Sequence, residues 1–398
     1  MKTSESRILT THAGSLPRSP QLLEALLALN AGEAIDTAAL DDLLATDTDY
    51  VLREQQKAGI DIGSDGELPR IAFHMYVKDR MSGFGGRTTR GTFSDIAKFP
   101  QWASQWLGTS AVDDADSDNL TQTADAPAAV GELHYDPELK AVQGELDLFA
   151  RALDRATASF DETFVTAASP GIVTTTMTLD EGNEFYATDE EYVLAVAEEL
   201  KLEYDYIVSR GHILQIDAPD LAMERSLMFQ NAPLRDFLDR VEVHIEAINR
   251  AIRDIPRDRV RLHACWGNYA GPHVDDVELQ EVLPLLYRAN VGALSLPCGN
   301  PRHQHNWRSF EQFPPPDDLT LIVGVIDVTT NYVEHPEVVA DRIGQFASAI
   351  GDPHRIIAGT DCGFGTIAGY VLVAEDVVWP KLAALAAGAE IASRRLMG

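Results

Sequence analysis

Short β-rich runs alternate with longer helical patterns along the chain, and this alternation constrains the fold more than any other feature. Apolar residues at helical spacing fill the intervals, for example over 192–207, 237–252, 277–286 and 338–350. Strands that alternate with helices of this length indicate βαβ units and a parallel sheet. Eight such strands favour a (β/α)8 barrel over an open sheet. The predicted strands are 8–14, 60–65, 163–168, 212–217, 259–265, 292–298, 320–327 and 355–361.

Polar residues follow the apolar runs, at the positions where the predicted strands end. In a (β/α)8 barrel these carboxyl ends converge on one face, which is where the active sites of this fold lie. An open doubly wound sheet would gather ligands only at a switch point. No Gly-x-Gly-x-x-Gly fingerprint follows a strand and no Walker loop is present, which disfavours dinucleotide and P-loop functions. The polar strand-end residues are Gly14-Ser15, Asp65-Gly66-Glu67, Ser169-Pro170-Gly171, Asp217, His263 with Cys265, Cys298, Asp327 and Asp361-Cys362.

Residues 84–135 interrupt the alternation. This stretch holds Trp102, Trp106 and the acidic run 113–118. A structureless stretch of this length is uncommon inside a compact domain, so part of it is expected to fold as short strands or helices. We interpret it as an insertion after the second strand that covers the barrel mouth. The chain, 1–398, is then predicted to be a single barrel domain.

The composition limits the partners of this protein. Of its 398 residues, 45% are hydrophobic and 24% are charged, as in an ordinary soluble globular protein. The formal net charge of -30 opposes binding to nucleic acid or to anionic membranes, because both require a basic surface. We find no apolar run long enough for a membrane span and no apolar signal segment at the N-terminus, and free cysteines suit a reducing cytoplasm. Small-molecule substrates are expected, and the oligomeric state stays open, a homo-oligomer included.

The cysteines all stand at predicted strand ends, and one belongs to a His-x-Cys pair. Residues two apart on a strand point to the same face, so His263 and Cys265 can reach one ion, although a buried histidine beside a small apolar cysteine is the alternative. Cys362 ends the eighth predicted strand, and the barrel brings it toward the fifth. Three imidazole or thiolate ligands with an open position describe a catalytic Zn²⁺ site. Such a metal holds a substrate thiol as the nucleophilic thiolate, which predicts alkyl transfer onto sulfur.

Other polar residues at the strand ends suit acid–base chemistry or substrate binding. Asp65, Glu67 and Asp217 supply carboxylates that can hold a substrate ammonium group, act as acid and base, or cap the following helix. Arg302 and His303 follow the sixth predicted strand, where they suit substrate orientation more than metal binding. The candidate catalytic residues are Asp65, His303 and Asp327.

Seven different motifs lie at or near the predicted strand ends: Thr10–Arg18, Ser64–Glu67, Ser169–Gly171, Gln215-Ile216-Asp217-x-Pro219, His263-x-Cys265-x-Gly267-Asn268, Asn300-Pro301-Arg302-His303 and Gly359–Gly363. In this order and spacing they resemble the catalytic, C-terminal domain of cobalamin-independent methionine synthase, and most closely its short, single-barrel relatives. The resemblance covers nearly the whole chain. Each motif alone is weak, whereas the combination is specific.

The resemblance implies a zinc ion at the top of the barrel, homocysteine as the thiol and a methyl-folate as the methyl donor. The implied zinc ligands are His263, Cys265 and Cys362. The implied homocysteine-binding residues are Ser15, Glu67 and Asp217, with the carboxylates holding the ammonium group. Arg302 is taken as a further substrate-binding residue.

Three positions depart from the family pattern. Pro297 stands where the family has a zinc-ligating glutamate, and its neighbour Cys298 is the predicted substitute, because the chain can turn near a proline although a one-residue shift reverses the face of a strand. Ala218 replaces an acidic residue, and the segment from Asp327 to Thr330 lacks a histidine that the resemblance links to protonation.

Two alternatives therefore stay open. One is alkyl transfer to another thiol, as in epoxyalkane:coenzyme M transferase, and the other is a metal-binding barrel without catalysis. A lyase like the related porphyrin-acting barrels would not need the His-x-Cys pair and the distant cysteine.

Overall fold

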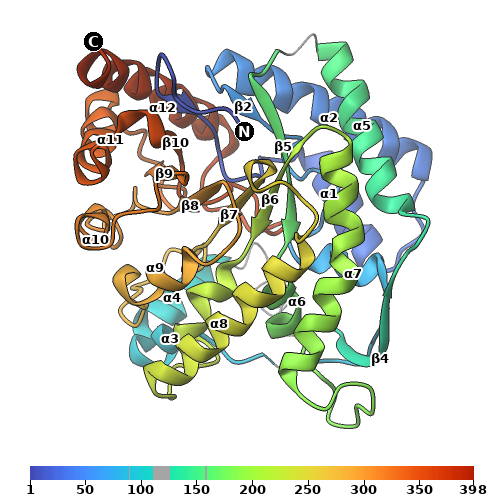
Figure 1. The fold of residues 1–398 in the computed structure, drawn as a ribbon. Coiled ribbons are helices and arrows are strands. Elements are labelled where there is room, and N and C mark those ends of the chain that lie inside the picture. Colours follow the sequence, from blue (N-terminus) through green and yellow to red (C-terminus); the bar gives the residue numbers. More distant parts are fainter. Residues whose placement is uncertain (89, 111–125, 157–158) are drawn as a thin grey trace.

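The computed structural model describes residues 1–88, 90–110, 126–156 and 159–398, and its centre is a ring of parallel strands (Figure 1). Eight strands form one sheet in the order β1-β10-β9-β8-β7-β6-β5-β2, and a bridge from Thr11 to Ile62 joins its two edges. All the predicted strands are present, and the predicted (β/α)8 barrel is confirmed. The strands are β1 (Leu9–Thr10), β2 (Ile62–Gly63), β5 (Glu162–Ala168), β6 (Ile213–Asp217), β7 (Val260–His263), β8 (Ala293–Leu296), β9 (Thr320–Ile326) and β10 (Ile356–Thr360).

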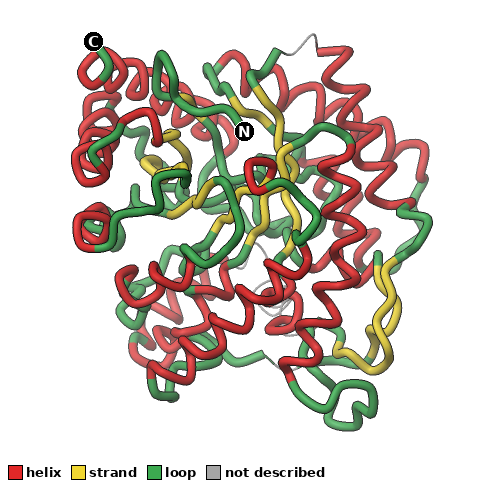
Figure 2. The backbone as a smooth tube through the Cα atoms, viewed as in Figure 1, coloured by secondary structure: helices red, strands yellow, loops and turns green. Residues whose placement is uncertain are grey.

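Helices surround the strands (Figure 2). Side-chain caps fix where some of them begin: Ser19 accepts from the N–H of Leu22, and Ser169 accepts from that of Ile172, each with a proline in the first turn. None of the described helices has the length and apolar character needed to cross a membrane. The helices that flank the strands are α1 (Pro20–Asn30), α2 (Thr37–Lys57), α5 (Lys140–Ala156), α6 (Pro170–Thr176), α7 (Asp189–Ser209), α8 (Leu234–Ala251), α9 (Leu279–Leu286), α10 (Trp307–Gln312), α11 (Pro336–Ile350) and α12 (Glu375–Leu396).

Two apolar clusters pack the strands. The larger joins the sheet to the helices, and the smaller takes one side chain from each of seven barrel strands. Ile213 of the smaller cluster shares a strand face with Gln215 and Asp217, because residues two apart point the same way. The smaller cluster is therefore the lower layer of the barrel interior. Its members are Leu9, Ile62, Phe164, Ile213, Ala293, Ile322 and Ile357.

A buried arginine fills the middle of the barrel. Arg261 donates from Nε to Gln215 Oε1 (2.7 Å) and from Nη2 to the carbonyl of His12 (2.9 Å). Its guanidinium group lies 3.5 Å from the ring centroid of Phe164, and burial lowers its pKa to about 9. The side chains in the middle of the barrel are therefore packed, and the barrel is not an open pore.

The chain between β2 and β5 leaves the barrel. It forms the antiparallel hairpin of β3 (Met81–Gly85) and β4 (Ala128–Tyr135), and the helices α3 (Ser94–Lys98) and α4 (Pro100–Ser110). In Figure 1, β4 lies beside α7, whereas α4 is tied to the loop after β7 through Trp102 and Ala270. Part of the predicted insertion, including the acidic run 113–118, lies outside the described residues.

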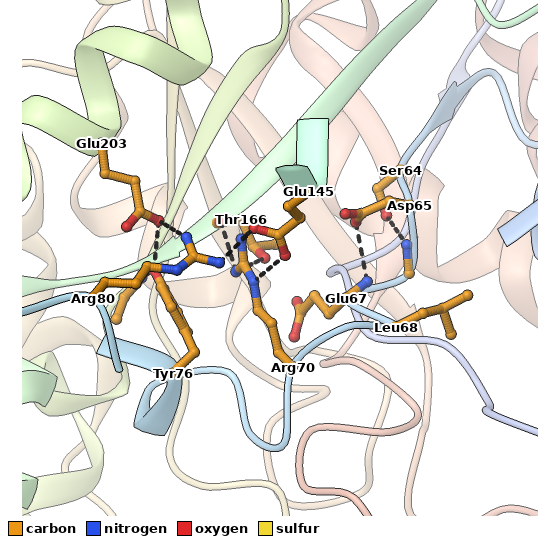
Figure 3. A network of polar contacts seen from close by, with 12 residues as sticks. Ser64, Asp65, Glu67, Leu68, Arg70, Tyr76, Arg80, Glu145, Thr166 and Glu203 are labelled. Atoms are coloured by element: carbon orange, nitrogen blue, oxygen red, sulfur yellow. Dashed lines mark hydrogen bonds and ion pairs between the residues drawn. The ribbon is translucent and has the colours of Figure 1, made fainter. Parts of the chain in front are cut away.

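A buried charge network fastens this stretch to the barrel (Figure 3). Glu145 of α5 binds Arg70 (Oε1–Nε 2.7 Å) and Arg80 (Oε2–Nη2 2.7 Å), and Arg80 Nη1 lies 3.1 Å from Glu203 Oε1. Tyr76 donates its hydroxyl to Glu203 (2.9 Å), and both guanidinium groups lie 4.3 Å from its ring centroid. Two carboxylates thus balance two guanidinium groups. The network holds the loop after β2 against α5 and α7.

Candidate active site

Three buried side chains meet at the carboxyl-terminal face of the barrel. His263 ends β7, Cys265 follows two residues later, and Cys362 follows β10. One ligand atom from each lies within 4.8 Å of the other two, and His263 Nε2 is 3.6 Å from Cys362 Sγ. The structure thus brings together three of the four predicted metal ligands.

The donor set has the chemistry of a zinc site. Ser295 Oγ lies 3.2 Å from His263 Nδ1, which leaves Nε2 facing the sulfur atoms. A hydrogen bond from Cys362 and another from His263 hold the pKa of Cys265 well below its usual range, whereas the Cys265 bond and burial raise the pKa of Cys362. Cys265 is therefore the first of the two thiols to ionise. One imidazole and two sulfurs suit Zn²⁺ and leave the fourth tetrahedral position for another ligand.

The structure does not bring Cys298 into this group. Its side chain is 1% exposed and belongs to the apolar core, and burial raises the pKa of its thiol well above the usual value. Asp361 accepts from the main-chain N–H groups of Cys298 (2.9 Å), Gly299 (2.6 Å) and Asn300 (2.8 Å), which fixes the turn. The expected rotation of the chain after Pro297 does not occur. The one-residue shift from the family position leaves this side chain on the other face.

We call His263, Cys265 and Cys362 together the metal group. Two buried carboxylates face the cavity that this group lines. Asp217 ends β6 and is the register partner of His263 on β7. Glu67 follows β2, with a left-handed backbone conformation (φ 57°). Burial and the neighbouring Asp217 raise the pKa of Glu67 to about 8, and burial raises the pKa of Asp217 to about 6. A cationic group placed between them would favour ionisation of both.

Ser15 lies where the chain that follows Cys362 meets the N-terminal strand. Its Oγ accepts from the N–H of Gly365 (3.3 Å), and its carbonyl accepts from the N–H of Phe364 (2.8 Å). A Cβ on Gly363 would come within 2.0 Å of Ser15 Oγ, so a glycine is required for this close approach. Ser15 therefore lines the cavity directly beside the candidate metal ligands.

Asp65 and Asp327 line neither of the two cavities at the barrel mouth. Asp65 Oδ1 accepts from the N–H of Glu67 (3.0 Å), so it orients that residue. Asp327 Oδ1 accepts from the N–H (2.8 Å) and hydroxyl (2.7 Å) of Thr329, which closes its own turn. These two residues, predicted to be catalytic, are placed behind the site.

The cavity that holds the metal group has a volume of about 380 Å³. Its polar end is formed by the metal group with Ser15, Glu67 and Asp217. Aromatic and aliphatic side chains dominate the remainder, which suits a ligand with a flat or apolar body. The aromatic residues are Phe73, Phe93, Trp106, Tyr269 and Tyr370.

A second cavity of about 450 Å³ adjoins the first and shares Cys362 and Asn268 with it. Arg302 and His303 line the second cavity, and their role in substrate orientation stays a prediction. His303 Nε2 lies 2.9 Å from Asp276 Oδ2, and burial lowers the pKa of His303. Its Nδ1 has no hydrogen-bond partner within the part of the chain that is described.

Several residues of the site were not predicted. Ser295 is the register partner of His263. It stands two residues before Pro297, so the period of two along a strand could have placed it on the same face as that position. Asp276 and Tyr269 lie in a loop without a periodic pattern, and the fold brings Tyr269 to both cavities and Asp276 to His303.

The fold and site define a class: a (β/α)8 barrel that presents an imidazole, two thiols and two buried carboxylates at the carboxyl ends of its strands. No protein-family model matches the sequence. Two curated relatives are methionine synthases, from Thermococcus kodakarensis (27% identical over 87% of this chain and 82% of the relative) and Sulfurisphaera tokodaii (26% identical over 97% and 93%).

Solved structures share the fold. A B12-independent methionine synthase from Shewanella sp. W3-18-1, in complex with selenomethionine, aligns with a TM-score of 0.69, 22% identity and coverage of 98% of this chain and 99% of that one. A putative vitamin-B12 independent methionine synthase from Listeria monocytogenes aligns with a TM-score of 0.63, 17% identity and coverage of 98% and 99%. The predicted resemblance is confirmed: over most of its length the chain is similar in sequence to curated methionine synthases, and it shares the fold of two B12-independent methionine synthases.

Proposed function

We propose that this protein is a zinc-dependent methyltransferase that moves a methyl group from a methyl-folate-type donor onto the thiol of homocysteine, which yields methionine. The proposal rests on one observation: the metal group and the two buried carboxylates line the same cavity. The names of the curated relatives support the same reaction, and the Shewanella protein was solved with the selenium analogue of its product. Three free, buried cysteines suit a cytoplasmic setting.

The metal ligands in this proposal are His263, Cys265 and Cys362, with Cys298 outside the set. A zinc ion held by these three residues would supply a position for the substrate thiol and keep that thiol deprotonated at neutral pH. Ser295 would keep the His263 ring in the tautomer that turns Nε2 toward the ion.

The carboxylates of Glu67 and Asp217 bind the ammonium group of the amino acid in this proposal. Both are buried beside the metal group, so they fix the amino acid at one end while its sulfur lies at the other. Holding a nucleophile at both ends lowers the entropic part of the barrier to transfer. Asp65 contributes by orienting Glu67 through its N–H.

The donor faces the sulfur from the aromatic part of the cavity. A flat heteroaromatic donor suits the rings of Phe93, Trp106 and Tyr269. As the sulfur–carbon bond forms, the carbon–nitrogen bond of the donor breaks and its nitrogen takes up a proton. We assign the delivery of that proton to His303, held by Asp276 in the adjoining cavity, and the orientation of the donor to Arg302.

We also propose that the described part of residues 84–135 covers the barrel mouth within a single domain of residues 1–398. Phe93 and Trp106, from this stretch, line the cavity. Trp102 Nε1 donates to the carbonyl of Ala270 (3.1 Å), which ties α4 to the loop after β7. These contacts support a cover that excludes water from the thiolate.

The test has two stages. The protein should contain stoichiometric zinc, and it should methylate homocysteine with a methyl-folate donor, whereas Cys265→Ala should lose both metal and activity. A protein without zinc would contradict the proposal and favour a non-catalytic barrel. Transfer to coenzyme M in place of homocysteine would favour the other alkyltransferase reaction.

A further inference from the structure

The guanidinium group of Arg18 joins two loops of the candidate site. We define the carboxylate loop as residues 65–70, which contain Glu67, and the metal loop as residues 361–366, which contain Cys362. Within the carboxylate loop, Arg18 donates from Nε to the carbonyl of Leu68 (3.2 Å) and from Nη2 to those of Glu67 (2.8 Å) and Arg70 (2.7 Å). On the other side, Nη1 donates to the carbonyl of Gly365 (2.9 Å) in the metal loop.

Main-chain bonds place the segment before Arg18 between the same two loops. The N–H of Leu16 donates to the carbonyl of Gly66 (3.0 Å), and the N–H of Phe364 donates to the carbonyl of Ser15 (2.8 Å). Arg18 completes this connection with a planar fork of donors, whose directions are fixed relative to one another. A lysine would carry the charge but not the fork.

The backbone that Arg18 holds is in an unusual conformation. Glu67 has a φ of 57°, which a residue with a Cβ adopts only where its surroundings compensate. The carbonyl of Glu67 also accepts from the N–H of Arg70 (3.0 Å). Its carboxylate packs against Gly14, where a Cβ would come within 2.2 Å of Oε1, so there is little tolerance for movement. The position of the Glu67 carboxylate therefore depends on the contacts of its backbone.

We propose that Arg18 is a positioning residue that sets the separation between the Glu67 carboxylate and the metal loop. This inference rests on the proposed function. Its consequence is a selection of substrates by shape: a thiol is accepted when its ammonium group stands at the separation that Arg18 maintains. Homocysteine meets the requirement, cysteine is one methylene shorter, and des-amino homocysteine lacks the ammonium group.

A purely structural role makes a different prediction, and Arg355 provides the matched control. Its side chain also donates to backbone carbonyls, to Leu319 (3.0 Å) and Pro315 (3.2 Å), but these precede β9 at the opposite end of the barrel. Loss of Arg355 should lower the thermal midpoint of unfolding without changing the choice of thiol. Loss of Arg18 should change that choice.

The experiment compares Arg18→Ala, Arg18→Lys and Arg355→Ala with the zinc-loaded wild type. In Arg18→Ala we expect the KM for homocysteine to rise about 10- to 100-fold and the preference over cysteine and over des-amino homocysteine to fall by the same factor. Zinc content should be unchanged. Added methylguanidinium should restore part of the preference, and methylammonium should not. Arg18→Lys keeps the charge, and its preference should also fall.

An unchanged preference in Arg18→Ala, or an equal loss in Arg355→Ala, would overturn the inference. So would rescue by methylammonium as effective as that by methylguanidinium. Calorimetry of thiol binding gives the same preference as a ratio of dissociation constants, without turnover. A wild type that binds these thiols but transfers no methyl group would therefore contradict the proposed function while the role of Arg18 is still decided. If Arg18→Ala does not fold, Arg18→Lys supplies the comparison.

Discussion

Asp217 and His263 are register partners on the neighbouring parallel strands β6 and β7. Strands of a sheet lie about 4.8 Å apart, so a carboxylate and an imidazole stand side by side on a rigid support. Residues placed on strands hold their separation better than residues on loops. Glu67 and Cys362 complete the site from loops, and these loops are the part that needs additional contacts.

Cys298 should prove dispensable for metal binding. Because its thiol lies in the apolar core outside the metal group, Cys298→Ala is expected to retain the zinc affinity of the wild type. Cys362→Ala should lower that affinity by more than about 100-fold, since even an outer partner of a ligand contributes roughly 10- to 100-fold. Competition with a chelator measures both. A large loss of affinity in Cys298→Ala would show that the turn after Pro297 rearranges when the metal binds.

Ser295 should influence zinc affinity through the His263 ring. Removing its hydroxyl in Ser295→Ala leaves Nδ1 without the partner that orients the ring, and we expect about a 10-fold loss of zinc affinity. Thr163→Ala is the control, because Thr163 Oγ1 makes a comparable contact with His212 Nδ1 (2.8 Å) outside the metal group. Equal zinc affinities of Ser295→Ala and Thr163→Ala would contradict this role.

Binding of homocysteine should release a proton from the carboxylates near neutral pH. The pKa of Glu67 is raised to about 8, so the group is largely protonated in the empty site at neutral pH, and an ammonium group favours its ionised form. Homocysteine affinity should therefore increase as the pH rises toward about 8. Calorimetry in buffers of different ionisation enthalpy counts the protons released.

Des-amino homocysteine is the reference in this measurement, because its thiol loses a proton at the metal but it brings no ammonium group. The excess proton release of homocysteine over this analogue should vanish in Glu67→Gln. An excess that persists in the variant would assign the proton to another group.

The buried network around Glu145 should be a major source of stability. Glu145→Ala leaves Arg70 and Arg80 buried without this carboxylate, and breaking a buried ion pair in this way costs about 3–5 kcal/mol. Asp49→Ala, which removes the exposed pair with Arg155, should cost less than about 1 kcal/mol. Urea unfolding measures both.

The sign of the pH dependence follows from the pKa of Glu145, which its two arginines hold at about 2 despite burial. A depressed carboxyl pKa stabilises the folded state at neutral pH, and the contribution is lost as the pH falls toward about 2. The difference in stability between wild type and Glu145→Ala should therefore shrink in acid. A difference that is constant with pH would mean that packing, not charge, is the cause.

Periodicity in the sequence was sufficient to predict the barrel and most of the metal group. Alternating runs located all eight strands, and the period of two placed His263 and Cys265 on one face. Cys362 was found because a closed barrel brings the end of β10 close to the end of β7. These inferences depend on regular strands, in which the spacing of residues along the sequence determines the face to which each side chain points.

The remaining parts depend on contacts between distant segments. The predicted ligand Cys298 lies outside the group because Asp361, 63 residues away, accepts from its N–H and fixes the turn. Asp327 is predicted to be catalytic, and local hydrogen bonds from Thr329 to its Oδ1 and from Thr330 to its Oδ2 occupy the carboxylate in this structure. No spacing rule connects Arg18 to Gly365. Hydrogen bonds between loops that are distant in the sequence can be identified only from the folded structure.

The pairing of β1 with β10 has a consequence for biosynthesis. Ser15 leaves the ribosome early, His263 and Cys265 follow much later, and Cys362 comes two residues after the last strand of the barrel. In the proposed zinc site, a growing chain therefore offers only two of the three ligands until Cys362 has been made. Stable loading of this proposed site would therefore wait until β10 has paired with β1 and closed the ring.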